Sequence, residues 1–223
     1  MSVNIDNYNK ILATALKYNA KLIAVSKTKP AEDIKELYTI GQKEFAENYV
    51  QEFIEKVPQL SENINWHFIG HLQSNKVKSI LPFVHLIHGV DSIKLVKEIN
   101  KQAEKIGIEV DCLLQIHIAK EESKFGFDEA EVEELMLLPV ATDLLNINIR
   151  GVMGMATLTT DTTQIKTEFL QLKRIYDNCK LMSPSPKSFN ILSMGMTSDF
   201  EIARVIVPAP PCIAIEYLIF RNS

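Results

Sequence analysis

Short apolar segments of strand length alternate with segments of helical periodicity along almost the whole chain, and this alternation constrains the fold most strongly. Parallel strands need long crossover connections, which helices usually supply, so the pattern predicts a parallel sheet. The predicted strands are residues 22–25, 44–48, 65–70, 86–90, 110–118, 147–153, 189–193 and 213–216. Eight such units favour an α/β fold, a single-domain (β/α)₈ TIM-type barrel over residues 1–223, rather than a doubly wound open sheet.

Helical periodicity places a leading N-terminal helix over residues 3–20, ahead of the first strand. The other predicted helices are 31–40, 49–56, a segment ending at Ile80, 91–105, 129–138, 164–179 and 199–204. Asp91 is the expected N-cap of its helix. No Gly-x-Gly-x-x-Gly turn follows the first strand, which disfavours a dinucleotide-binding fold.

Composition and charge exclude several classes of protein. The net charge of −4 argues against a general surface for nucleic acid or anionic membranes. No stretch approaches the roughly 20 apolar residues of a membrane-spanning helix, and the N-terminus has no basic or apolar signal segment, so we expect a cytoplasmic protein. Cys112, Cys179 and Cys212 are far apart and form no Cys-x-x-Cys pair, so we expect neither a disulfide nor a metal site.

The first strand ends in a segment that carries two lysines. Lys27 and Lys29 directly follow residues 22–25, and Pro30 then opens a helical pattern. Ligands of parallel α/β folds gather at the carboxyl ends of strands, so a lysine here could act as a nucleophile or bind a phosphate. The alternative is that both are ordinary solvated side chains, and this segment alone leaves both open.

In a barrel, the segments that follow the strands share one rim and can be interpreted as a single site. Besides the two lysines, this rim holds Asn48, residues 71–76, Asp91, Lys124, Met155 and residues 193–199. The last segment contains Ser193, Gly195 and Thr197 ahead of a helical segment, and a helix start offers free N–H groups to an anion. The alternative is an ordinary N-cap by Thr197 or Ser198. A lysine together with an anion site suggests a phosphorylated carbonyl compound held as an imine.

Two histidines carry competing interpretations. His67 lies in a strand pattern between Trp66 and Phe68, which favours a residue of the core or wall over an acid–base role. His88 and Asp91 could orient one another, but we expect Asp91 to cap its helix instead.

Several motifs, in order along residues 5–204, resemble the pyridoxal phosphate homeostasis protein family, whose members are single-domain relatives of the alanine racemase barrel. The matching segments are Ala24–Pro30, Glu47–Glu52, Trp66–Lys76, His88–Asp91, Lys124–Gly126, Arg150–Met153 and Leu192–Asp199. The resemblance implies that Lys27 carries pyridoxal 5′-phosphate as an internal aldimine, a Schiff base. It also implies that Ser193, Gly195 and Thr197 belong to the phosphate-binding turn.

The same resemblance implies further properties. Asn48, Lys124 and Met155 fall on positions near the cofactor, although none would be catalytic. Family members are thought to buffer and deliver the cofactor in vitamin B6 homeostasis without established turnover, so we expect a binding protein rather than an enzyme. We expect a monomer with transient contacts to cofactor-dependent enzymes.

Residues 207–223 depart from the family pattern. Where the family has an arginine that faces the pyridine nitrogen and two glycines, this chain has Ala214, Glu216 and Arg221. Losing a charge-assisted bond and placing a carboxylate near phosphate should weaken non-covalent binding by about two powers of ten or more. We predict a cofactor that is bound but weakened, unless Arg204 or Arg221 reaches the vacated place. The alternatives are an amino-acid racemase of the alanine racemase barrel type and a degenerate scaffold without cofactor.

Overall fold

A computed structural model describes residues 3–120, 125–137 and 144–206, and the backbone of 212–217. The N-terminal half contains α1 (Ile5–Lys17), β1 (Ala20–Val25), α2 (Ala31–Thr39), β2 (Glu44–Glu47), α3 (Val50–Lys56), η1 (Val57–Gln59), β3 (Asn65–Phe68), η2 (Ser74–Lys76), α4 (Val77–Ile80) and β4 (Val84–Val90). The C-terminal half contains α5 (Ile93–Ile106), β5 (Val110–Gln115), α6 (Glu129–Leu137), β6 (Ile147–Met153), α7 (Thr162–Met182), β7 (Ile191–Met196), α8 (Phe200–Ile206) and β8 (Cys212–Tyr217). The predicted order of strands and helices is confirmed.

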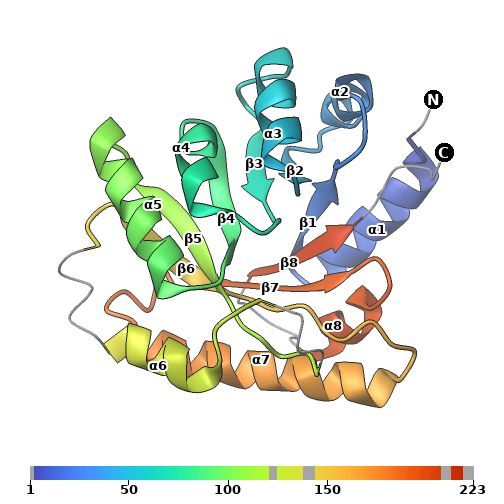
Figure 1. Cartoon of the computed structure of the whole chain (residues 1–223). Helices are drawn as coiled ribbons and strands as arrows, with labels where there is room; N and C mark the ends of the chain where they lie inside the picture. Colours follow the sequence, from blue (N-terminus) through green and yellow to red (C-terminus); the bar gives the residue numbers. More distant parts are fainter. Residues whose placement is uncertain (1–2, 121–124, 138–143, 207–211, 218–223) are drawn as a thin grey trace.

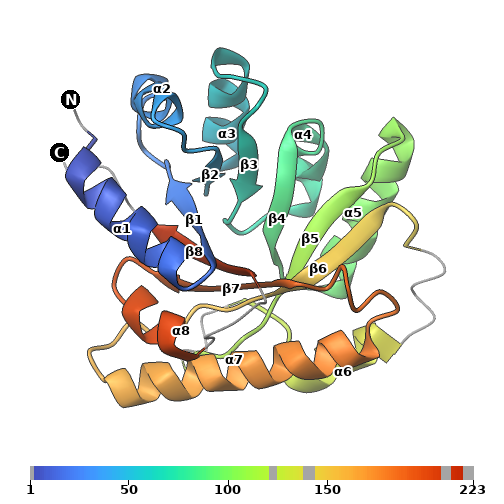
Figure 2. The ribbon, with the colours of Figure 1, turned by 180° about the vertical axis from the view of Figure 1, so that it is seen from behind.

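The strands form one curled parallel sheet. Each strand pairs with the next along the chain, and β8 also pairs with β1, where the register joins Ala20 to Ile213 and Ala24 to Tyr217. The helices lie outside the sheet, α2 to α5 along one side and α6 to α8 along the other (Figures 1 and 2). The α/β class and the parallel sheet are therefore confirmed, and the sequential strand order excludes the doubly wound alternative.

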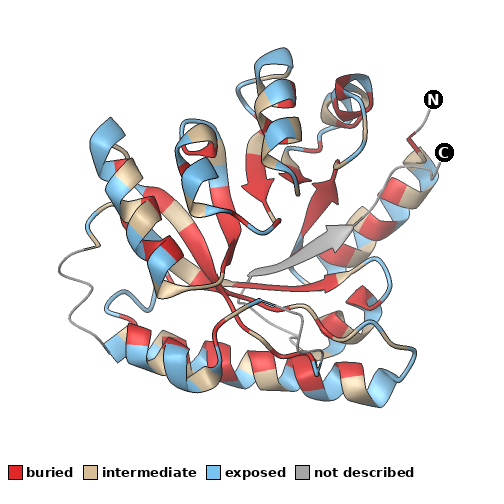
Figure 3. Cartoon of the chain, viewed as in Figure 1, coloured by how far each residue is buried: buried red, intermediate tan, exposed pale blue. Residues whose placement is uncertain are grey.

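The alternation of side chains along each strand divides the core in two. Outward-facing strand residues pack under the helices. Trp66 and Phe68 of β3, for example, pack against Phe53 of α3, with ring centroids 5.8 and 6.1 Å from that of Phe53. Inward-facing residues form smaller clusters, among them one of Ile23, Val25, Ala46 and the half-buried Ile69. Figure 3 shows buried residues concentrated along the described strands. Strands β1 to β7 therefore present alternate residues to the interior of the curled sheet.

Several predicted boundaries are wrong. The seventh strand runs to Met196 instead of ending at Ser193, so residues predicted as a turn belong to β7. Ser92, not Asp91, caps α5, because its hydroxyl accepts a hydrogen bond from the N–H of Leu95. The long helix α7 begins earlier than predicted, at Thr162, because Asp161 caps it. Among the described residues, no helix is both long enough and apolar enough to cross a bilayer.

Candidate functional site

The segment after β1 holds Lys27 half-buried on a fixed turn. Ile23 and Val25 face the interior, and Lys27 lies two residues beyond the end of β1, at the carboxyl end of the strand. Thr28 has a φ of +64°, which is uncommon for a residue other than glycine, and its N–H donates to Glu52 Oε1 at 2.8 Å. No residue that the structure describes forms an ion pair with Lys27. The turn is therefore held by the bond between the Thr28 N–H and Glu52, directly beside Lys27.

A buried ion pair lies behind this turn. Lys56 Nζ of α3 donates to Glu47 Oε1 and to the carbonyl of Ser26, both at 2.8 Å, and the Ser26 hydroxyl donates to the same Glu47 oxygen at 2.6 Å. Glu47 is fully buried, and burial raises its pKa although the hydrogen bond and charge of Lys56 oppose the shift. The pair ties the ends of β1 and β2 to α3 from the outer side of the sheet.

The structure brings most of the predicted site residues to the interior face near the carboxyl ends of the strands. Asn48 follows β2 and is half-buried, and its carbonyl lies so close to Gly70 that a Cβ there would be 2.0 Å away. Met155 follows β6, is half-buried and packs against a cluster that includes Met153. Ser193 is buried within β7. Lys124 lies outside the described residues.

The end of β7 packs closely on α8. Gly195 has a φ of +90°, and a Cβ there would lie 2.9 Å from the Cβ of Ala203, so only glycine fits without displacement. Asp199 Oδ1 accepts the N–H of Met196 at 2.6 Å, whereas Thr197 is exposed. Asp199 therefore stabilises this turn, for which a cap by Thr197 or Ser198 was one of the two alternatives.

A chain of hydrogen bonds crosses the interior of the sheet toward Ser193. His67 Nε2 lies 2.8 Å from Glu44 Oε2, and its Nδ1 lies 2.8 Å from His88 Nε2. His88 Nδ1 in turn lies 3.1 Å from Ser193 Oγ. Burial lowers the pKa of His67 to about 3, although Glu44 opposes the shift. His67 is thus a buried neutral residue, as predicted, but it also belongs to a polar network.

Asp91 and Arg204 take roles different from those expected. Asp91 Oδ2 lies 2.9 Å from His71 Nδ1, and the ring of His71 stacks on Phe125 with centroids 4.4 Å apart. Arg204 pairs with Glu201, and its guanidinium lies 4.6 Å from the ring centroid of Tyr18. Arg204 therefore packs beside the end of α1 and does not replace the missing arginine of the family. Arg221 lies outside the described residues.

The sequence analysis missed the Glu47–Lys56 pair and the partners of His67. The alternation along β2 gave one local indication of the Glu47–Lys56 pair. Glu47 shares the outer face of the strand with Phe45, and a charge on a face that a helix covers needs a partner. The histidine chain had no comparable signal, since its members come from separate strands.

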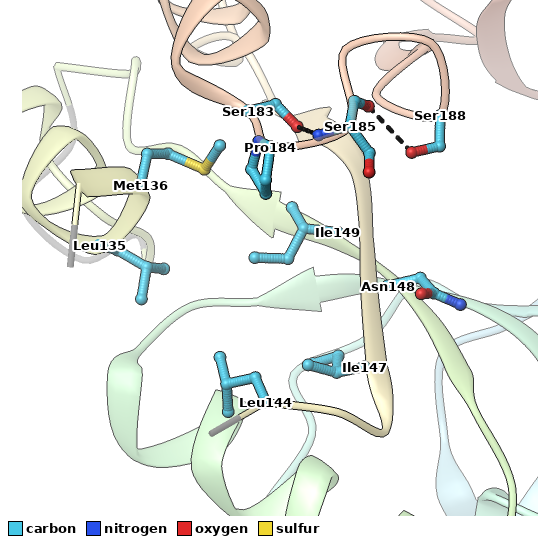
Figure 4. A pocket seen from close by; sticks show the side chains of 10 residues that line it. All are labelled: Leu135, Met136, Leu144, Ile147, Asn148, Ile149, Ser183, Pro184, Ser185 and Ser188. Atoms are coloured by element: carbon cyan, nitrogen blue, oxygen red, sulfur yellow. Dashed lines mark hydrogen bonds between the residues drawn. The ribbon is translucent and has the colours of Figure 1, made fainter. Parts of the chain in front are cut away.

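Two hollows lie at opposite ends of the strands, and one of them is at the end that holds Lys27. A cavity of about 170 Å³ lies between α6, the end of α7 and the first residues of β6, where Ile147, Ile149 and Pro184 line it (Figure 4). It is at the amino end of β6, opposite the strand ends that hold Lys27. A second hollow, of about 280 Å³, is lined by Asn48, His71 and Lys76 among others and therefore lies at the rim.

Comparison with known proteins defines the class first. The family model described as "Alanine racemase, N-terminal domain" matches residues 5–206, which include every described strand from β1 to β7. An alanine racemase of Clostridium difficile 630 has the same fold, with a TM-score of 0.70 at 14% identity over 97% of this chain and 56% of that one. The parallel sheet with Lys27 after its first strand thus has the fold of this domain.

Closer relatives define the family. The pyridoxal phosphate homeostasis protein of Aquifex aeolicus is 36% identical over 82% of this chain and 79% of its own, and that of Synechocystis sp. is 36% identical over 88% of each. The chain belongs to the pyridoxal phosphate homeostasis protein family. PipY of Synechococcus elongatus, 31% identical, superimposes with a TM-score of 0.86 without pyridoxal phosphate (95% of this chain, 96% of that one) and 0.82 with it bound (96% and 97%).

Proposed function

We propose that this protein binds pyridoxal 5′-phosphate at the rim, in vitamin B6 homeostasis, with Lys27 as the point of covalent attachment. The observation that carries the proposal is the position of Lys27, half-buried directly after the carboxyl end of β1, in a parallel sheet whose strand β7 contains Ser193. The family membership and the pyridoxal phosphate bound to PipY support the same cofactor.

The residues present fit this cofactor chemically. Pyridoxal 5′-phosphate supplies an aldehyde that reacts with an amine, an aromatic ring and a phosphate dianion. Lys27 offers the amine, which reacts only as the neutral form. Ser193, Gly195 and Thr197 would hold the phosphate at the end of β7, where Gly195 allows β7 to pack closely on α8. Asn48 and Met155 would lie beside the aromatic ring of the cofactor, and Lys124 is a further proposed contact.

We infer that the strands close into a complete (β/α)₈ barrel in a single domain spanning residues 1–223. The pairing of β8 with β1 supports closure, since it joins the strand that precedes Lys27 to the last strand. Closure matters to the site, because β8 lies between β1 and β7 and its register opposes Ala214 to Ser193 and Glu216 to Met196. The residues that depart from the family pattern thus lie between the two strands that supply Lys27 and Ser193, which supports the prediction of weakened binding.

The proposal includes a cytoplasmic, monomeric protein that delivers the cofactor through transient contacts with cofactor-dependent enzymes. The net charge of −4 supports the absence of a nucleic-acid partner. Binding without turnover is favoured because His67 and His88 are engaged in the chain of hydrogen bonds that runs from Glu44 to Ser193. Their ring nitrogens therefore bond to protein groups rather than face Lys27 as a second acid–base group.

An absorption spectrum with and without added pyridoxal phosphate tests the proposal. The wild-type protein should show a visible band, and borohydride reduction should then fix the cofactor mass on the peptide that contains Lys27. Lys27→Ala should abolish both signals, while Lys29→Ala, in the same turn, should retain them.

Two other results would replace the proposal. Protein that stays colourless and unlabelled with excess cofactor would indicate a scaffold that has lost the site. Exchange of the α-proton of alanine for deuterium that depends on Lys27 would indicate a racemase instead of a binding protein.

A further inference from the structure

The four residues Glu44, His67, His88 and Ser193 form a continuous hydrogen-bonded chain, here called the interior chain. They come from β2, β3, β4 and β7. His67, His88 and Ser193 are buried, and Glu44 keeps some contact with solvent, with 14% of its side chain exposed. The chain thus begins at the first residue of β2, near the amino ends of the strands, and ends at Ser193 close to the proposed phosphate position.

The charges around Glu44 fix the direction of the hydrogen bonds. Burial alone would raise the pKa of Glu44, but the hydrogen bond and charge of His67, with further bonds from Asn65 and Lys21, lower it to about 2. Lys21 Nζ and Asn65 Nδ2 each lie 3.0 Å from Glu44 Oε1. Glu44 is therefore an acceptor only, and the proton between it and His67 belongs to His67 Nε2.

Each remaining bond follows from the one before it. A neutral imidazole with its proton on Nε2 can only accept at Nδ1, so His88 donates to His67 from Nε2. His88 Nδ1 must then accept, and Ser193 Oγ–H donates to it. In the protein without phosphate, the Ser193 hydroxyl proton therefore points along the interior chain and not toward the rim.

A phosphate dianion has only acceptor oxygens, so it needs the opposite orientation of Ser193. We propose that the interior chain is a proton relay in which phosphate binding at Ser193 draws one proton onto the His67–His88 pair. This inference rests on the proposed function, because it takes Ser193 as a phosphate contact.

The proton count of this change balances. Ser193 Oγ–H turns to a phosphate oxygen, and His88 Nδ1–H donates to Ser193 Oγ. His88 Nε2 then accepts from a proton on His67 Nδ1, while His67 Nε2–H still donates to Glu44. The chain holds one proton more than before, taken from solvent, and its positive charge lies between the Glu44 carboxylate and the phosphate.

The described groups that face the chain set the balance of charges. Glu44 favours the added proton, whereas Lys21 and any charge on His85, whose ring centroid lies 5.7 Å from that of His67, oppose it. The phosphate dianion supplies the attraction that the unliganded protein lacks. Uptake of one proton makes binding up to about tenfold tighter for each unit by which the pH is lowered.

Nuclear magnetic resonance of ¹⁵N-labelled histidine reports the protonated ring nitrogen directly, and pyridoxine 5′-phosphate, which lacks the aldehyde, is the probe. Without the probe, His67 and His88 should both show protonated Nε2 and unprotonated Nδ1. With it, Nδ1 of both rings should become protonated. Single His→Gln variants assign the signals.

A second measurement keeps the inference testable if a variant is unstable. Binding of the same probe by wild-type protein should tighten between pH 8.5 and 7, and His67→Gln, which cannot carry the proton, should flatten that dependence. An His88 ring protonated at Nδ1 without the probe, or rings unchanged by bound probe, would overturn the relay. If pyridoxal phosphate gives no visible band with Lys27 but the histidine rings still respond to the probe, only covalent attachment is refuted. If neither pyridoxal phosphate nor the probe binds, both the relay and the proposed function are refuted.

Discussion

Mild acid should destabilise this protein chiefly through His67. Burial lowers the pKa of His67 to about 3, although Glu44 opposes the shift, whereas an unfolded histidine titrates near 6.5. Between these two pH values the unfolded chain binds a proton that the folded protein excludes. The stabilisation is therefore complete above pH 6.5 and is lost as the pH falls from 6.5 toward 3.

The size of the effect follows from one proton. The free energy of unfolding should fall by about 1.4 kcal/mol for each pH unit below 6.5, which gives about 2 kcal/mol by pH 5. The pKa of Glu44, held at about 2, adds a further loss only below its ordinary value of 4.5. Burial raises the pKa of Glu47, so the comparison of wild type with His67→Gln between pH 7 and 5, in which Glu47 is common to both proteins, isolates the histidine contribution.

Urea unfolding followed by circular dichroism at pH 7, 6 and 5, without added phosphate ligand, measures this loss. His67→Gln should lose about 2 kcal/mol less than wild type over this range, whatever its stability at pH 7. His117→Gln, at a histidine that is not among the groups acting on His67, is the matched control and should follow wild type. If wild type and His67→Gln lose the same stability on acidification, the buried neutral His67 is refuted.

Three further predictions concern other groups. Glu52→Ala removes the acceptor of the Thr28 N–H in the turn between β1 and α2, so it should lower the free energy of unfolding by about 1 kcal/mol and weaken the visible band. Glu55→Ala, on the exposed face of α3, is the control and should change neither the stability nor the band. Urea unfolding measures the stability, and absorption measures the band. Lys56→Met leaves Glu47 buried without its cation and should lower the free energy of unfolding by about 3 kcal/mol at pH 7. This loss should shrink as falling pH neutralises the Glu47 carboxyl. Adding Glu47→Gln should restore most of the lost stability in the same urea assay. Burial raises the pKa of the Cys112 thiol, so mass spectrometry should find it unmodified by N-ethylmaleimide until the protein unfolds.

Local periodicity was enough to predict the order of the elements, because helix and strand patterns depend on neighbours along the chain. The end of β7 could not be predicted in this way. Gly195 suggested a turn, but pairing of Met196 with Glu216 of β8 extends the strand. Asp91 and Ser92 are both good capping residues, and the contact of Asp91 with His71, far away in sequence, decided between them.

The polar network was beyond reach for a related physical reason. His88 and Ser193 are 105 residues apart, and they meet only because the sheet curls so that β4 and β7 face one interior. A sequence pattern can place each of them on an inward face, but it cannot show which atom donates. The direction of these hydrogen bonds depends on Glu44, at the other end of the chain of bonds. The Glu44 carboxylate, near the amino ends of the strands, therefore orients the Ser193 hydroxyl at the proposed phosphate position. A resemblance based on motifs predicts Ser193 as a phosphate contact, whereas only the three-dimensional arrangement places its hydroxyl 3.1 Å from His88 Nδ1.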